Sequence, residues 1–341
     1  MADVRERSRA GDRERDRAQL ILVTGLAVAV TLVALVLLLN TVIYTQNLAT
    51  RGAGVEDGEA IGFRQEVVEG VGDVLDAENR EEYDSEIQVM ENVTAGISRF
   101  DALLSRYYAE RGTVADIEQS TVTPENVTNG SLIHQTNSSR DFSAAGNDEP
   151  VDWTLAEDAG AGNTDAAGVR NFTMTVSREN LTTADSPPAG FSVLLDGDSG
   201  NVWRMYVYDD VDEGITVAVK NGTEGSTTVV PSVSGPEATI DLTAGTINGS
   251  AHSELVWAKG ISAPYDVDFR SGDEATGTYS LTVATPDGEA TNVRTDNLAG
   301  PGDEESPRWA YAVYAAEFDV QFQTTDIEFH TALRVAPGEP E

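Results

Sequence analysis

The pattern of hydrophobic and polar positions divides the chain into three regions. The first is an apolar run, LILVTGLAVAVTLVALVLLL, which covers Leu20–Leu39 without a charged residue. Twenty helical residues at 1.5 Å each span about 30 Å, the hydrocarbon thickness of a bilayer. A cleaved secretory signal has a shorter apolar core and ends at an A-x-A site, whereas this run ends in Asn40-Thr41-Val42. The run therefore predicts one transmembrane helix, not a secretory signal or a buried globular helix.

The second region, 51–112, predicts amphipathic helical structure. The glycine-rich stretch RGAGVEDG at 51–58 separates it from the apolar run. Apolar residues then recur at helical steps of three, four and seven, with Asp101 and Arg106 off that stripe. The stripe consists of Ile87, Met90, Ile97, Leu104 and Tyr107, and it can begin earlier with Val67, Val71, Val74 and Leu75. We expect packing on the protein's own domain in preference to a coiled coil, and glycines 70, 72 and 96 weaken a long uninterrupted helix.

The third region, beyond Gly112, alternates apolar and polar residues with period two, which is typical of strands. Strands are expected at 202–208 and 215–219 around an acidic DDVDEG turn, and at 278–283. At the end of the chain, apolar residues at 318, 320 and 322 alternate with polar ones up to a Thr324-Thr325-Asp326 turn. Alternation resumes from Ile327 to Val335, with His330 pointing outward, so this segment predicts an antiparallel hairpin with one buried face.

Together the three regions define the expected fold class as α+β. It comprises a single N-terminal transmembrane helix, an amphipathic helical region and a mainly antiparallel β domain, arranged as a sandwich or a curved sheet. The Ala/Gly/Asp-rich residues 143–168 are expected to form a long loop around one short strand.

Flanking arginines predict how the apolar run is oriented. Arg51 is the only base in the fifteen residues after it, whereas six arginines precede it: Arg5, Arg7, Arg9, Arg13, Arg15 and Arg17. Because cytoplasmic flanks carry the excess of bases, the N-terminus should be cytoplasmic and the C-terminal part extracellular. The expected parts are a basic cytoplasmic leader at 1–18, a transmembrane helix at 19–50, a helical stalk region at 51–112 and an extracellular β-rich domain at 113–341.

The charge balance narrows the function classes. The chain of 341 residues has a net charge of -36, with 58 acids against 22 bases, and its only lysines are Lys220 and Lys259. Such a density of acids repels itself at ordinary salt, but in molar salt the Debye length falls to about 3 Å. The composition therefore favours a protein of a salt-loving organism. It also argues against nucleic acid as a partner, because no basic face is available to neutralise phosphates.

Cysteine is absent, which removes disulfides, thiolate metal sites and cysteine nucleophiles together. The extracellular domain must therefore be held by core packing.

Asn-x-Ser/Thr sequons are the most informative short motif. Roughly two or three are expected by chance among 16 asparagines in a chain of this composition, yet eight occur. Their position on the extracellular side predicts a glycosylated surface domain, although a Thr-rich β protein can also generate sequons incidentally. The candidate glycosylation sites are Asn92, Asn126, Asn129, Asn137, Asn171, Asn180, Asn221 and Asn248.

Motifs for metals, cofactors or catalysis are weak. Asp196–Asn201, DGDSGN, resembles the start of a calcium loop but has Gly at its fifth position and Val207 at the twelfth, so a hairpin turn is favoured. This turn and the acidic turn at 209–213 could bind calcium only weakly at the surface. The three histidines, His134, His252 and His330, lack metal-ligand spacing. We therefore expect no catalytic residues, no metal site and no cofactor.

The residues around the start of the apolar run carry a resemblance. Asp16-Arg17-Ala18-Gln19-Leu20 resembles the class III signal of archaeal type IV pilins, in which a charged pair precedes Gly or Ala and then the apolar helix. The resemblance implies cleavage by a membrane prepilin peptidase between Ala18 and Gln19, with Arg17 part of the recognised charged pair. The layout of leader, helix and acidic β domain is similar to that of haloarchaeal pilin-like membrane proteins. Val23, where many pilins carry glutamate, and the large external domain favour a minor subunit.

These patterns predict a function in surface assembly. The expected protein is a pilin-like glycoprotein of the cell membrane, a minor pilin or adhesion accessory subunit that assembles through its N-terminal apolar helix. Its expected partners are the membrane, the prepilin peptidase, other pilin-like subunits and the N-glycosylation machinery. The alternative is a permanently anchored single-pass surface binding or adhesion protein that does not polymerise. A tethered enzyme that uses carboxylates ranks behind both.

Overall fold

A computed structural model describes residues 58–146, 150–161, 168–187, 190–197, 200–222, 225–285 and 292–340. The predicted transmembrane helix, the leader and the processing residues Arg17, Ala18 and Gln19 lie outside the described residues. The chain divides after Gly62, and Phe63–Glu341 form one compact unit. Among the helices described, none is both long enough and apolar enough to cross a bilayer.

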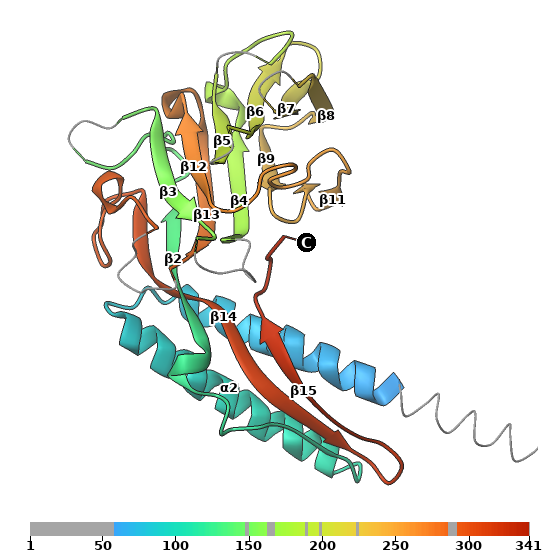
Figure 1. The fold of residues 1–341 in the computed structure, drawn as a ribbon. Helices are drawn as coiled ribbons and strands as arrows, with labels where there is room; N and C mark the ends of the chain where they lie inside the picture. Colours follow the sequence, from blue (N-terminus) through green and yellow to red (C-terminus); the bar gives the residue numbers. More distant parts are fainter. Residues whose placement is uncertain are drawn as a thin grey trace, which may run out of the picture. The chain divides into compact units, whose positions relative to one another are not determined.

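Two helices form the helical region. The first is described over residues 58–79, and α2 covers Glu86–Ala109 (Figure 1). Ser85 starts α2 as its N-cap, because its hydroxyl accepts a hydrogen bond from the Gln88 backbone N–H at 3.3 Å. The predicted helices are thus present, and the early seam is confirmed at Val67, Val71 and Leu75, which are fully buried, whereas Val74 is half-buried.

The buried stripe predicted for α2 is wrong in part. Ile87 is 68% exposed and Tyr107 is 43% exposed, while the stripe actually runs through Val89, Val93, Ile97, Asp101, Leu104 and Tyr108. Asp101 is buried, contrary to expectation, because Ile117 N and Gln119 Nε2 donate hydrogen bonds to its carboxylate at 2.8 and 2.9 Å. A carboxylate can be buried when such donors satisfy its oxygen atoms.

The helix glycines have a packing role that propensity alone does not reveal. A Cβ on Gly96 would lie 2.6 Å from Val74 Cγ1, and one on Gly70 would overlap the ring of Phe100. The two helices therefore approach each other too closely for larger residues at these positions. This close packing offsets the cost of glycine within a helix.

The strands form two antiparallel sheets. The nine-stranded sheet contains β1 (Val114–Ile117), β2 (Val127–Gln135), β4 (Val169–Ser177), β9 (Glu237–Asp241), β10 (Thr246–Ile247), β11 (Ser250–Ala251), β13 (Thr276–Ala284), β14 (Arg308–Gln323) and β15 (Glu328–Val335). Its order is β1-β14-β2-β13-β4-β9-β10-β11, and β15 pairs with β14. The six-stranded sheet has the order β3-β12-β5-β6-β7-β8 and contains β3 (Trp153–Ala159), β5 (Ser192–Gly197), β6 (Val202–Asp210), β7 (Gly214–Asn221), β8 (Thr227–Val233) and β12 (Tyr265–Arg270).

Both sheets contribute to one aromatic core. Phe269 of β12 packs its ring 5.0 Å from Tyr279 of β13, 6.3 Å from Phe172 of β4 and 5.3 Å from Phe191. Each of these residues is at most 3% exposed, so the two sheets face each other across this layer. The predicted mainly antiparallel β domain is confirmed, in the form of a sandwich. Within 143–168 the predicted short strand is found as β3, while residues 147–149 and 162–167 of the expected loop lie outside the described residues.

The terminal hairpin agrees with the prediction. β14 pairs with β15 in a register that places Phe322 opposite Phe329, and Phe318, Val320 and Leu333 are buried on one face. The helices cover this face (Figure 1). There the ring centroid of Phe63 lies 5.4 Å from that of Tyr108 and 5.5 Å from that of Phe322. The amphipathic helices therefore pack on their own domain, as expected.

Candidate functional site

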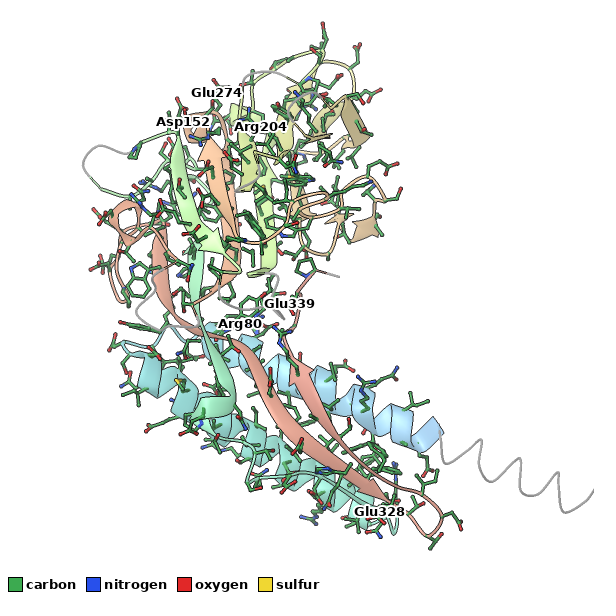
Figure 2. All side chains as sticks on the ribbon, in the orientation of Figure 1. Arg80, Asp152, Arg204, Glu274, Glu328 and Glu339 are labelled. Atoms are coloured by element: carbon green, nitrogen blue, oxygen red, sulfur yellow. The ribbon has the colours of Figure 1, made fainter. Side chains whose placement is uncertain are left out.

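A shallow groove of about 550 Å³ lies on the outer face of β2, β13 and β4. Its floor follows from strand alternation: Phe172, Met174 and Leu281 turn into the core, so their neighbours turn outward. The floor is rich in hydroxyls, and residues of the turn between the helices border it; Arg80 is labelled there in Figure 2. The lining includes Arg80, Glu82, Leu132, His134, Thr173, Thr175, Thr278 and Ser280.

Three charged or titratable side chains fix one side of the groove. Glu82 is held in the left-handed region at φ 52°, and its carboxylate accepts a hydrogen bond from Arg308 Nη2 at 2.8 Å. Arg308 Nε donates to His134 Nε2 at 3.1 Å, which assigns the imidazole proton to Nδ1. His134 Nε2 also lies 3.4 Å from Glu82 Oε1. The trio connects the turn between the helices to β2 and β14.

The surroundings of His134 lower its pKa from the ordinary value, mainly through burial. Burial lowers the pKa of His134, and the Arg308 guanidinium lowers it further, while the Glu82 carboxylate acts in the opposite direction. Because Nε2 already accepts the bond from Arg308, this nitrogen cannot also bind a metal or accept a proton from a ligand. The trio therefore holds its three side chains in place along this side of the groove. The groove itself offers hydroxyl and guanidinium groups that can hydrogen-bond a polar ligand.

A second ionic network joins the first helix to β4 and β14. The Arg170 side chain is 0% exposed, and its Nη1 donates to Asp76 Oδ1 and to the Pro337 carbonyl, both at 2.9 Å. Its Nη2 donates to the Val313 carbonyl at 2.9 Å. Arg170 thereby links the first helix, β4, β14 and the segment that follows β15, whose Glu339 is labelled in Figure 2. Sequence reasoning missed this residue, because a single arginine within a strand pattern carries no signal of burial.

The structure separates the eight sequons into two groups. Asn129 and Asn171 are half-buried, and their Nδ2 atoms donate to helix carboxylates, to Glu86 at 2.6 Å and to Asp76 at 3.1 Å. A glycan on either Nδ2 would have to fit beside the helix whose carboxylate accepts this bond, at a half-buried position. The other six asparagines are exposed, namely Asn92, Asn126, Asn137, Asn180, Asn221 and Asn248.

Both calcium-like acidic segments are hairpin turns. β5 pairs with β6 so that Asp196 lies opposite Val202, which confirms the turn reading of DGDSGN; residues 198–199 lie outside the described residues. In the turn between β6 and β7, Asp210 Oδ1 accepts the backbone N–H groups of Asp212 and Glu213 at 3.0 and 3.1 Å. Asp209 forms an ion pair with Arg178 at 2.7 Å. These carboxylates stabilise the fold locally.

The histidines differ from the interpretation based on their spacing. His330 is solvent-facing, as predicted, with 55% of its side chain exposed. Strand pairing nevertheless places it beside Glu118 and Asp319, with all three ligand atoms within 4.8 Å of one another. These residues are far apart in sequence, so only the register of three strands could have revealed the cluster.

Comparisons with known proteins give one family match. A sequence model described as a family of unknown function (DUF7261) matches residues 14–169, a segment that includes the apolar run, both helices and β3. No curated protein matches the chain. A solved structure, "Crystal structure of Scytalido-glutamic peptidase with a peptide based transition state analog", is similar at 9% identity and a TM-score of 0.17, and the match covers 62% of this chain and 91% of that one. A likeness at that TM-score carries no argument about fold or activity.

Proposed function

We propose that this chain is a membrane-anchored cell-surface glycoprotein of pilin type, a minor pilin or a pilus or adhesion accessory subunit of a haloarchaeon. The observation that carries the proposal is the sequence Asp16-Arg17-Ala18-Gln19 at the start of the apolar run Leu20–Leu39. A charged pair followed by Ala and Gln is the pattern at which a prepilin peptidase would cut. The retained run would then be both membrane anchor and assembly core.

The charges of the leader explain why cleavage would matter. Six arginines precede Gln19, and each subunit would carry them at the base of its apolar helix. Charges in an apolar bundle are costly because little water is present to solvate them. Removal of residues 1–18 would allow the helices to pack on one another. The enzymatic alternative is not part of the proposal.

The fold supports an outward-facing role for the C-terminal part. Its two sheets share an apolar core without disulfides, which suits display outside the cell in high salt. Six of its sequons are exposed and accessible to an N-glycosylation machinery. In this proposal the groove of β2, β13 and β4 is the surface offered to partners.

Processing tests the assembly proposal. Intact-mass measurement and N-terminal sequencing of protein from a host with the peptidase should find a chain that begins at Gln19, and deletion of the peptidase should restore residues 1–18. The substitution Ala18→Leu should block processing, whereas Ala27→Leu within the apolar run should leave it intact. A mature chain that begins before Gln19 in the peptidase-containing host would refute the proposal.

The groove favours a second candidate, a permanently anchored surface binding protein that does not polymerise. A hydroxyl-rich floor with Arg80 at its rim can bind a polar ligand without any assembly of subunits. Co-purification with surface filaments separates the two candidates. Cleaved protein in filaments supports the first, and uncleaved protein in the membrane, with loss of adhesion on deletion of the gene, supports the second.

A further inference from the structure

Three adjacent strands bring a histidine and two carboxylates together. Glu118 follows β1 directly, and its backbone N–H donates to the Asp319 carbonyl in β14 at 2.8 Å. In β15, His330 lies opposite Gln321, the second residue after Asp319 along β14. The strand order β1-β14-β15 therefore places Asp319 between the other two residues.

Strand alternation fixes which way the three side chains point. The neighbours Ile117, Phe318 and Val320 are all buried beneath the helices. Glu118, Asp319 and His330 consequently turn to the opposite, solvent-facing side of the same strands. Glu328, labelled at the start of β15 in Figure 2, marks the tip of the hairpin near which they lie. The three side chains are thus presented by a paired backbone rather than by a loop.

The distances match those between ligands of one metal ion. His330 Nε2 lies 3.1 Å from Glu118 Oε2, and the ligand atoms of all three residues lie within 4.8 Å of one another. Ligands about 2.1 Å from a zinc ion are separated by roughly 3.0–3.4 Å from each other. The His330–Glu118 edge already has this length. Asp319 requires a shift of at most about 1.5 Å, within reach of rotation about its side-chain bonds.

The charges leave a place for a cation. Glu118 Oε1 accepts a hydrogen bond from Ser120 Oγ at 2.8 Å, which orients the carboxylate and leaves Oε2 towards His330. Within the described part of the chain, the Asp319 carboxylate accepts no hydrogen bond, while the backbone N–H of Asp319 donates to Thr121 Oγ1 at 2.9 Å. Two carboxylates this close to each other repel, and a bound cation would relieve that repulsion.

We propose that Glu118, Asp319 and His330 form a binding site for a divalent transition metal ion of the zinc type. The imidazole ligand favours zinc over calcium or magnesium, which prefer six or more oxygen ligands or retained water. Three protein ligands leave at least one coordination position for water or for a group from another molecule. The ion would cross-link β1, β14 and β15 on the face opposite the helices. The site is distinct from the acidic turns considered for calcium.

An ordinary surface ion pair between His330 and Glu118 is the simpler explanation. Their side chains are 55% and 47% exposed, and such pairs contribute little. Asp319 separates the two explanations, because the ion pair does not use it and the metal site does. The decisive substitution is therefore Asp319→Asn, which keeps the size of the side chain but removes a ligand charge.

The test uses the full chain in detergent, without a polyhistidine tag, after treatment with EDTA and in molar KCl to suppress diffuse binding by other acids. Titration with Zn²⁺ against a chromophoric chelator should show one tight site, and Zn²⁺ should raise the unfolding temperature measured by tryptophan fluorescence. Asp319→Asn, Glu118→Gln and His330→Gln should each weaken binding at least tenfold. Glu328→Gln and His252→Gln, which lie outside the cluster, should not.

Each outcome decides the proposal. Retention of the affinity by Asp319→Asn would show an ion pair only and overturn it. Equal displacement of Zn²⁺ by millimolar Ca²⁺ or Mg²⁺ would also overturn it, because diffuse acidic binding has no imidazole preference. Tryptophan fluorescence of each variant confirms that it is folded, so that a loss of zinc binding reports on the site itself.

Discussion

The substitution Arg170→Met tests whether one buried guanidinium holds the helical region and the sheet together. Methionine replaces the aliphatic part of the arginine side chain without branching but removes the guanidinium group with its charge and all its donors. The substitution removes the ion pair between Arg170 on β4 and Asp76 on the first helix, and it leaves the Pro337 carbonyl without this donor. The Val313 carbonyl also loses Arg170 but still accepts from Asn79 Nδ2 at 2.9 Å. The perturbation thus acts at the junction of four segments while the apolar volume is largely preserved.

The structure gives the expected magnitude. The breaking of a buried ion pair costs about 3–5 kcal/mol in total. The two carbonyls add little, because the one of Val313 keeps Asn79 as a donor and the bond to Pro337 is only partly buried. The Asp76 side chain is 34% exposed, so water recovers part of its hydration after the change. Its remaining hydrogen bond from Asn171 Nδ2 at 3.1 Å acts in the same direction. We therefore expect a loss near the lower end, about 3 kcal/mol.

Urea denaturation in molar KCl, followed by tryptophan fluorescence, measures this loss. All four tryptophans, at 153, 203, 257 and 309, lie in the β domain and report its unfolding. The matched control is Arg106→Met, because its ion pair with Glu110 is 80% and 68% exposed and should contribute under about 1 kcal/mol. In a double-mutant cycle with Asp76→Asn, the coupling energy should exceed about 1 kcal/mol. A loss below 1 kcal/mol for Arg170→Met, equal to that of the control, would refute the reasoning.

Three further predictions follow from the described residues. Burial, with Arg308, lowers the pKa of His134 below its ordinary value near 6.5, so the unfolded chain binds this proton more readily and stability should fall as the pH drops below about 6.5. Urea midpoints measured between pH 5 and 8 should show a smaller fall for His134→Gln than for the wild type. An identical fall in both proteins would contradict the assignment of this pH dependence to His134. Asn129 and Asn171 should remain unglycosylated while the exposed sequons carry glycans, as measured by site-resolved mass spectrometry; full occupancy at Asn171 would be inconsistent with its contact to Asp76. Gly96→Ala should lower the free energy of unfolding by about 1–2 kcal/mol through overlap with Val74, although alanine favours a helix over glycine by about 1 kcal/mol. In the control Gly72→Ala, the new Cβ would meet Pro337 at an ordinary 3.4 Å, so the free energy of unfolding should not fall.

The helical region shows where sequence periodicity succeeds and where it fails. The steps of three and four placed Val67, Val71 and Leu75 on the buried face, because these apolar side chains can lower their free energy only by leaving water. The same reasoning put Asp101 outside, since a lone carboxylate is costly to bury. Its donors come from Ile117 and Gln119, which no local pattern places beside it.

The candidate sites depend even more on pairing between distant segments. The groove combines β2, β4 and β13 with Arg80 and Glu82, and the sequence gives no indication of that neighbourhood. The distinction between exposed and half-buried sequons likewise arises from contacts with the helices. Sequence spacing could not identify the Glu118–Asp319–His330 cluster, because its members are separated by up to 212 residues.

The sequence by itself determined the class of each segment: an apolar run long enough for a bilayer, amphipathic helices and alternating strands that include the β14–β15 hairpin. These features follow from local rules, because side-chain direction repeats every 3.6 residues in a helix and every two in a strand. Only the tertiary structure decided which strands are neighbours, and hence that Arg170 is buried and that His330 meets two carboxylates. Strand order depends on long-range burial of surfaces, and many orders satisfy the same local pattern.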